Sequence, residues 1–471
     1  MTLSKRLSVA LPARALHATL PRPSFSRHRS AVGRLGWATA LAFLLGSMPA
    51  QAQSLSQLVE WARAYDATWQ AARSQYDATV SRAEQARAGL LPSVGLTGSA
   101  SYAHTEVNRP PLDLSAPSQS AGLQASQPLY RPANRITFEQ GQRSIELAQA
   151  QLDAASQDLL VRVSQAYFDV LSAEDTLRVL QAQKAAVSEQ RAAAQRNFDL
   201  GNATITDKQE AQARYDLVTA QEIAATNELQ VRRLALDQIV GRPAIAPLPL
   251  AQPVQLPPVL PADVNAWVRS AEERQPQVRQ AMVALDVARL ETRKAETGHL
   301  PTVDLQAGYA VQRNPNGTPT IPNVNSRVKN ATVGVSLNLP LFAGFAVQNR
   351  IKETLSLEEK SLADLDNARR SVAQAARSAY FGVQSGTSQV AALEAAEASS
   401  RSALEANQLG YQVGVRVNID VLNAQSQLYQ TQRDLAQARY NVLLGSLRLR
   451  QAAGTLTDED VRALDSLLAR P

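Results

Sequence analysis

The feature that most limits what this chain can fold into is a run of 110 residues without proline, from Ala133 to Arg242. Because proline interrupts helices, such a run is typical of very long helices. Glycine and small polar residues break its middle, in 196-RNFDLGNATITDKQEAQARYDLV-218, and a similar break follows in 409-LGYQVGVRVNIDVLNAQSQLYQ-430. The two breaks share four positions at a spacing of 213 residues: Phe198 with Tyr411, Gly201 with Gly414, Asp207 with Asp420, and Ala211 with Ala424. The sequence therefore predicts two helical hairpins built alike.

The breaks belong to an internal duplication. Three further motifs recur at spacings of 209 to 213 residues: 89-GLLPSVGL-96 with 298-GHLPTVDL-305, 128-PLY-130 with 340-PLF-342, and 166-AYFDV-170 with 379-AYFGV-383. Spacings this regular indicate a structural repeat. We predict a first repeat at 53–262, a second at 263–456 and a C-terminal segment at 457–471.

Each repeat is predicted to contain a helix, a β-hairpin, a long helix, a glycine break and another long helix. The first helices are expected at roughly 55–88 and 264–297. Between the repeats, 243–261 contains seven prolines and is expected to be an extended connector.

The N-terminal residues 1–52 are predicted to be a secretory signal peptide. They contain seven Lys or Arg and no Asp or Glu, then the apolar run 37-WATALAFLL-45 and Ala50-Gln51-Ala52. Without this segment, 41 basic residues face 42 acidic residues, so the basic pI gives no reason to expect nucleic acid as a partner. The chain has no cysteine, which excludes disulfides and an acylated N-terminal cysteine.

Signals for catalysis are sparse. Past residue 52 the histidines are His104 and His299, far apart in the sequence, and there is no G-x-S-x-G, P-loop or H-E-x-x-H motif. We expect no enzymatic activity, no cofactor and no metal site.

Four segments alternate apolar and polar residues with a period of two, as β-strands with two different faces do. They lie near 92–102, 121–125, 303–311 and 331–339, and the last places Val335 and Leu337 on one face and Ser336 on the other. Their polar hairpin tips are expected at 103–119 and 312–330. Tyr102, Tyr130, Tyr309 and Phe342 near the strand ends are typical of outer-membrane barrels. An ordinary half-buried sheet explains the alternation equally well.

Four strands are too few to close a barrel, and open strand edges in lipid leave backbone groups without hydrogen bonds. A barrel would therefore need two chains with eight strands or three with twelve, and an open pore favours three. Val335 and Leu337 would then face lipid and Ser336 the lumen.

The long helices carry a heptad pattern. Apolar residues follow 4-3 spacing at Leu159, Val163, Ala166, Val170, Ala173, Leu177 and Leu180. Leu160, Tyr167 and Leu171 form a second apolar edge, so this helix should have two neighbours. Side-by-side packing in a cylinder is one solution. A secreted structural coiled-coil protein or adhesin is the alternative, although it leaves the strands unexplained.

The chain resembles the TolC family of outer-membrane channel proteins across 53–471. The resemblance rests on the L-P-x-V-x-L strand entries, the A-Y-F motifs and F/Y-x-L/V-G with D-x-x-x-A at both breaks. The segments 214-RYD-216, 296-ETGHLPTVDLQ-306 and 438-ARYNVLLGSLRLRQAAGTL-456 resemble the branch that gives the family its name.

This resemblance implies an α+β membrane protein. A homotrimer would form a twelve-stranded β-barrel in the lipid of the outer membrane, continued by a long periplasmic α-helical barrel with a mixed equatorial region that includes 457–471. It would be the exit duct of an export system, with a periplasmic adaptor and an inner-membrane ABC, RND or MFS transporter as partners. Drugs or unfolded proteins would be its cargo.

The glycine breaks would be the hairpin tips at the periplasmic mouth. Glycine allows the backbone to reverse there, and Thr204 or Asn418 can cap the next helix, with Asp207 in a capping box. The resemblance implies that two tips dock the adaptor: Leu200-Gly201-Asn202 and Val413-Gly414-Val415.

The resemblance also implies a gate. Tyr411 and Arg416 would reach Thr206 and Asp207 on the neighbouring coil and hold the mouth shut. Asp420 would contribute to a carboxylate ring in the throat. At the second ring this chain has Asn423 where the family has aspartate, which leaves three carboxylates in a trimer rather than six.

Overall fold

The computed structural model describes residues 53–109, 111–318 and 321–469, which belong to one compact unit. The predicted signal peptide at 1–52 lies outside the described residues. In the first repeat the elements are α1 (Leu55–Tyr65), α2 (Ala67–Ala88), β1 (Ser93–Asn108), β2 (Pro111–Tyr130), α3 (Pro132–Asp199) and α4 (Ile205–Val240).

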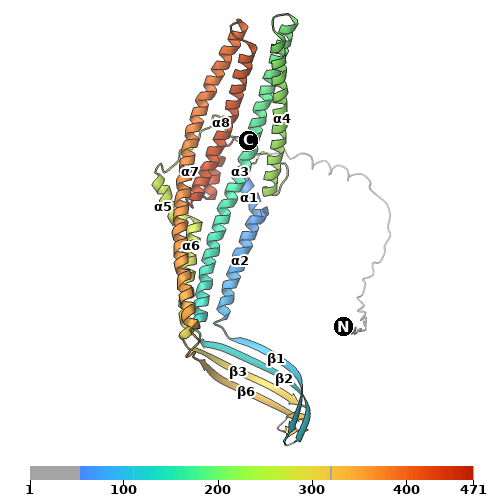
Figure 1. The fold of residues 1–471 in the computed structure, drawn as a ribbon, viewed down its shortest axis with the longest axis vertical. Helices are drawn as coiled ribbons and strands as arrows, with labels where there is room; N and C mark the ends of the chain where they lie inside the picture. The colour runs from blue at the N-terminus through green and yellow to red at the C-terminus, as the bar shows by residue number, and fades with distance from the viewer. Residues whose placement is uncertain (1–52, 110, 319–320, 470–471) are drawn as a thin grey trace, which may run out of the picture. The chain divides into compact units, whose positions relative to one another are not determined.

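The second repeat has the same order (Figure 1). Its elements are α5 (Val264–Arg274), α6 (Pro276–Glu296), η1 (Thr297–His299), β3 (Thr302–Asn314), β4 (Gly317–Thr318), β5 (Ile321–Pro322), β6 (Ser326–Asn338), α7 (Ala346–Gln412) and α8 (Asn418–Ala452), followed by α9 (Asp458–Asp465). Figure 1 shows the main sheet at one end of the helices and the tips of the hairpins α3–α4 and α7–α8 at the other. Across the described ranges, no helix is long and apolar enough to cross a membrane.

The prediction of one continuous helix at the start of each repeat was wrong. The first is broken at Asp66, whose carboxylate accepts the N–H of Trp69 at 2.7 Å and caps α2. The second is broken at Gln275, because Pro276 begins α6 and disfavours helical geometry in the residue before it. The sequence alignment of the repeats places Asp66 and Gln275 at equivalent positions, 209 residues apart.

At each break, the glycine that follows the last long helix of the same repeat packs against the residues of the break. Gly241 follows α4 with φ 74°, and a Cβ there would lie 2.2 Å from the ring of Tyr65. Gly454 follows α8 with φ 69°, and a Cβ there would lie 2.5 Å from Gln275. Glycine is required at both positions for two reasons: the backbone has positive φ, and there is no room for a side chain.

The main sheet is antiparallel in the order β1-β2-β3-β6, so β1 and β6 are its edges. Its register confirms the expected faces. Apolar residues stand in rows across the strands: Leu96 with Leu123 and Tyr309, Val94 with Ala125, Ala307 and Val333, Leu305 with Val335, and Val303 with Leu337. Residues one position along, among them Ser336 opposite Asp304, lie on the other face.

The expected hairpin tips are too long. Strand pairing between β1 and β2 continues through Asn108 and Pro111, and β3 pairs with β6 as far as Asn314 and Ser326. Polar side chains do not end a strand, because the ladder depends on backbone hydrogen bonds. The turn signals located the hairpins but not the ends of their strands.

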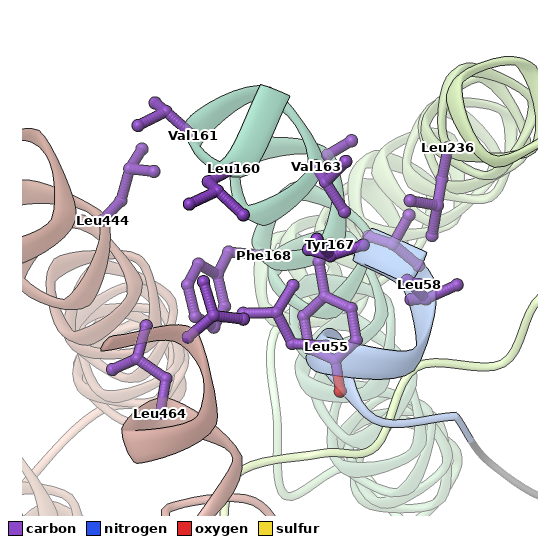
Figure 2. Packing of buried hydrophobic residues seen from close by; sticks show 14 of the residues in the cluster. Leu55, Leu58, Leu160, Val161, Val163, Tyr167, Phe168, Leu236, Leu444 and Leu464 are labelled. Carbon is purple, nitrogen blue, oxygen red and sulfur yellow. The ribbon is translucent and has the colours of Figure 1, made fainter. Parts of the chain in front are cut away.

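The main core lies where α1, α3, α4, α8 and α9 meet. Figure 2 shows Tyr167 and Phe168 of α3 between α1 on one side and α8 and α9 on the other. The hydroxyl of Tyr167 donates to the carbonyl of Leu248 at 2.9 Å and so fixes the proline-rich connector. Burial raises the pKa of Tyr167 above its usual range, which keeps this donor protonated.

The two edges predicted for the long helix are mostly buried, with Ala173 and Leu177 partly buried. Leu159, Val163 and Val170 have no exposed surface, and Leu160, Tyr167 and Leu171 are also buried in the core. At the sheet end, an ion pair joins the repeats, because Arg131 Nε donates to Asp304 Oδ1 at 2.8 Å and Nη2 donates to Oδ2 at 2.6 Å.

Candidate functional site

The tips of the two long hairpins have the same backbone structure. In the first, Gly201 has φ 78°, and Asn202 N donates to Asn197 O at 2.8 Å. In the second, Gly414 has φ 79°, and Val415 N donates to Gly410 O at 2.9 Å. These bonds close the last helical turn and reverse the chain, and positive φ favours glycine at the turning point.

The tips expose apolar side chains. Leu200 is 73% exposed, Val413 64% and Val415 75%. A Cβ at Gly201 or Gly414 would meet nothing within 4 Å. Exposed backbone and exposed apolar residues together make each tip accessible to a partner at close range.

Asp207 caps its own helix. Its Oδ2 accepts the backbone N–H of Thr204 at 3.0 Å and the hydroxyl of Thr204 at 2.8 Å, while Asp207 N donates to Thr204 Oγ1 at 3.2 Å. The predicted capping box is therefore confirmed. Thr206, one residue earlier, is exposed.

Tyr411 and Arg416 have other partners within the chain. Tyr411 Oη accepts from Asn197 Nδ2 at 3.2 Å, so Tyr411 does reach the first hairpin. Arg416, in the tip just before α8, pairs with Asp420 in the first turn of α8 at 3.6 Å. In the described part of one chain, neither side chain forms a hydrogen bond or ion pair with Thr206 or Asp207. Contacts with a neighbouring copy stay a prediction.

Asn418 was predicted as a possible helix cap, but the residue at the cap of α8 is Val417. Asn418 begins the helix itself and is 1% exposed. Its Nδ2 donates to Asp207 O at 3.4 Å, and its Oδ1 accepts from Gln190 Nε2. This side chain therefore links α8 to both helices of the first hairpin.

Sequence reasoning missed this link, although one signal pointed to it. The equivalent residue of the first repeat, 213 positions earlier, is the apolar Ile205. One helical turn after Asn418, Leu422 is buried against Ala194 and Ala211, so a small apolar contact supports the polar one.

The residues expected in the throat lie on α8. Asp420 is partly exposed and pairs with Arg416, as described. Asn423 is exposed, and its Oδ1 accepts from Arg214 Nη2 of α4 at 3.0 Å. The guanidinium of Arg214 therefore donates to a neutral amide at the position where the family has aspartate.

Within the first hairpin, cationic and aromatic side chains hold α3 and α4 together. The guanidinium of Arg191 lies 4.1 Å from the ring centre of Tyr215, and Lys184 pairs with Glu222 at 2.6 Å. The hydrogen bond that Lys184 donates to Glu222 raises the pKa of Lys184. These contacts stabilise a hairpin as a unit, which lets it present its tip.

The family comparison and relatives agree with this geometry. A family model described as outer membrane efflux protein matches residues 58–242 and 267–455, which correspond to the two repeats without the connector. The chain is 33% identical over 431 residues to the outer membrane protein TolC of Escherichia coli (strain K12), covering 89% of this chain and 86% of that protein.

The chain is also 32% identical over 404 residues to the alkaline protease secretion protein AprF of Pseudomonas aeruginosa, covering 84% of this chain and 83% of that protein. Among solved structures, the outer membrane protein VceC of Vibrio cholerae has the same fold, with a TM-score of 0.73 and 18% identity over 85% of this chain and 96% of that chain. The match of the family model to both repeats places this chain in the outer membrane efflux protein family.

Proposed function

We propose that three copies of this chain form an exit duct in the outer membrane, which carries cargo from a periplasmic adaptor and an inner-membrane transporter to the exterior. The duct performs no chemistry of its own. The observation that carries the proposal is a sheet with one apolar face and two open edges, continuous with four long helices, in a member of this family.

The open edges require partners. In lipid, each backbone group without a hydrogen bond costs several kcal/mol. Pairing β6 of one copy with β1 of the next removes both edges and keeps the antiparallel order of the sheet. Eight strands would be filled by side chains, so twelve strands from three copies suit a duct.

The cargo is proposed to be both drugs and unfolded proteins. The family description names efflux, and the relative AprF is named for protease secretion. Because one duct can pass different cargoes, we propose that the ABC, RND or MFS transporter in the inner membrane selects the cargo.

The adaptor is proposed to bind the tips Leu200-Gly201-Asn202 and Val413-Gly414-Val415. Their exposed apolar side chains suit a hydrophobic contact, and the open space over both glycines suits close approach by another helical hairpin. The two tips are alike, so one adaptor surface can bind either.

The gate is proposed to act between copies. Arg416 and Thr206 are both exposed, and the hydrogen bonds of Asp207 in the described chain use Oδ2, so Oδ1 can accept from a neighbour. Arg416 and Tyr411 would then hold Thr206 and Asp207 in the closed state. Asp420 would line the throat, with Asn423 turned to Arg214.

The test is fractionation followed by electrophoresis with and without boiling. We expect the chain in the outer-membrane fraction, with a slower-migrating trimer that becomes a monomer on heating. Export of a drug or protein should stop when the gene is deleted. A monomer in the soluble periplasmic fraction would instead support the coiled-coil or adhesin alternative.

A further inference from the structure

One interface within the chain joins the two repeats through their helices. Here α3 of the first repeat packs on α6 of the second. Gln140 Nε2 donates to Glu291 Oε2 at 2.9 Å, and Arg293 Nη2 lies 3.5 Å from Glu139 Oε2. We call this interface the internal seam. If three copies form a ring, α7 of one copy and α2 of the next must form a corresponding external seam.

The repeat gives the residues of that external seam. Elements α2 and α6 correspond at a spacing of 209 residues, and α3 and α7 at 213. The structure supports both spacings, because equivalent residues make equivalent contacts. Asn134 contacts Gly89 in the first repeat, with Nδ2 donating to its carbonyl at 2.6 Å, and Val347 contacts Gly298 in the second, 3.0 Å from a Cβ built there.

Applied to the internal seam, these spacings give two pairs. Glu139 and Arg293 correspond to Lys352 and Glu84, while Gln140 and Glu291 correspond to Glu353 and Arg82. Lys352 and Glu353 lie on α7, Arg82 and Glu84 lie on α2, and all four are exposed in the chain. Both pairs are oppositely charged. In Lys352–Glu84 the acid and the base have exchanged helices relative to Glu139–Arg293, whereas in Glu353–Arg82 an acid replaces the neutral Gln140 and a base replaces Glu291.

We propose that α7 of each copy packs on α2 of the next copy through the ion pairs Lys352–Glu84 and Glu353–Arg82. This inference rests on the proposed trimeric duct and names the contacts that close it. The partner is a second copy of this chain, because the complementary charges lie on the two faces that the repeat leaves uncovered.

The exchange of charges also opposes incorrect assembly. If α7 packed on α6 of another copy, Lys352 would face Arg293 and Glu353 would face Glu291. If α3 packed on α2 of another copy, Glu139 would face Glu84. Like charges at such positions penalise a wrong pairing. Only α7 against α2 brings opposite charges together in both pairs, which favours a ring over other aggregates.

The experiment is a charge exchange at one pair. One exposed ion pair contributes little, but Lys352→Glu places two like charges in each of three external seams. We expect Lys352→Glu and Glu84→Lys each to lower the temperature at which the detergent-solubilised trimer dissociates, by several degrees at low salt. The double variant should recover nearly the wild-type temperature, and the difference should shrink in high salt.

Lys360 provides a matched control, because it lies on α7 and pairs with Asp364 of its own helix at 2.7 Å. Lys360→Glu makes the same change in net charge, and adding Glu84→Lys to it should give no recovery. The inference is overturned if the double variant Lys352→Glu with Glu84→Lys dissociates at no higher temperature than the less stable of the two single variants. That outcome leaves the proposed function untouched. A wild-type chain that is monomeric under all conditions overturns the proposed function instead.

Discussion

At the scale of single residues, Asp66 has two roles at the break between α1 and α2. It caps α2 and accepts two hydrogen bonds from Arg162, at 2.9 and 3.0 Å. The hydrogen bond from Arg162 is the main reason that the pKa of Asp66 lies below its usual value, against the opposing effect of burial. The folded state therefore holds this carboxylate charged at pH values where the unfolded chain begins to bind a proton.

A lowered pKa fixes the sign of the pH dependence. The stability that Asp66 contributes is present above its unfolded pKa of about 3.9 and is lost as the pH falls through the folded value. We expect Asp66→Asn to lower the free energy of unfolding at pH 7 by on the order of 2 kcal/mol. The difference from wild type should shrink below about pH 4, as measured by urea unfolding across a pH series.

Asp158→Asn is the matched control, because Asp158 also binds Arg162 but its side chain is 53% exposed. An exposed pair contributes little, so this variant should stay close to wild type. A constant difference between wild type and Asp66→Asn from pH 7 to pH 3 would contradict the assignment.

The tip glycines carry the second prediction. Gly201 and Gly414 have positive φ and open space above Cα, so replacement by leucine costs about 1–2 kcal/mol each in backbone strain without a clash inside the chain. We expect Gly201→Leu with Gly414→Leu to leave the trimer in the membrane and abolish export, because the added side chains keep the adaptor away. Export and trimer yield are measured together.

Asparagine tolerates positive φ and is smaller, so Gly201→Asn with Gly414→Asn separates the backbone effect from the docking effect. This variant should retain more export than the leucine variant. Full export with both glycines changed to leucine would show that the tips are not the docking surface.

At the scale of elements, the proposed gate depends on contacts between hairpins of neighbouring copies. The capping role of Asp207 is a property of one helix, whereas a link to Arg416 joins two coils. Asp207→Ser keeps a capping side chain and should be nearly silent if capping is its only role. Loss of a charge-assisted link would instead cost about 1.5–3 kcal/mol in each copy, which is enough over three copies to shift a closed state toward an open one.

We therefore expect Arg416→Ser with Tyr411→Phe to raise single-channel conductance several-fold in planar bilayers. Cells carrying it should leak to large antibiotics even without a transporter. Asp420→Asn should reduce cation selectivity, because it removes the carboxylate expected in the throat. It also removes the 3.6 Å ion pair between Asp420 and Arg416 within the chain, which leaves Arg416 available for the proposed link to the neighbouring coil, so conductance should stay unchanged. Wild-type conductance in the double variant would contradict the gate. Arg416 and Tyr411 would then have only the contacts that they make inside one chain.

The sequence predicted the helices and strands better than the helix breaks and the contacts between helices. Periodicity and the repeat located the long helices, the four strands and both tips, because these patterns extend over many residues. The breaks at Asp66 and Gln275 and the buried position of Asn418 depend on what packs against one residue. A polar side chain can cap a helix, face solvent or bind a distant helix, and local sequence does not distinguish these three outcomes.

At the scale of the whole molecule, some surfaces of the two repeats pack against each other within one copy, whereas the equivalent surfaces at the outer ends of the repeats have no partner there. The internal pairing of β2 with β3 is satisfied inside one copy, while β1 and β6 are left at the edges. The same holds for the helices, where α3 meets α6 but α2 and α7 have uncovered sides. In the proposed duct, three copies related by rotation would satisfy strands and helices at once, and membrane insertion would then be coupled to assembly.

The last prediction concerns the outer surface of the barrel that this assembly would form. Val335 and Leu337 are exposed in the chain and lie in the apolar rows of the sheet, opposite Leu305 and Val303, whereas Ser336 lies opposite Asp304 on the polar face. An arginine near the middle of the membrane costs about 2–4 kcal/mol on a lipid-facing position and much less on the lumen side. We expect Val335→Arg to reduce strongly the yield of heat-modifiable trimer in the outer membrane. Ser336→Arg should assemble as wild type does, but with a lower conductance because the side chain narrows the pore. Because the two substitutions introduce the same side chain at neighbouring residues of one strand, they differ only in the face they occupy. Equal tolerance of arginine at both positions would mean that neither face contacts lipid, and the sheet would then belong to a soluble domain.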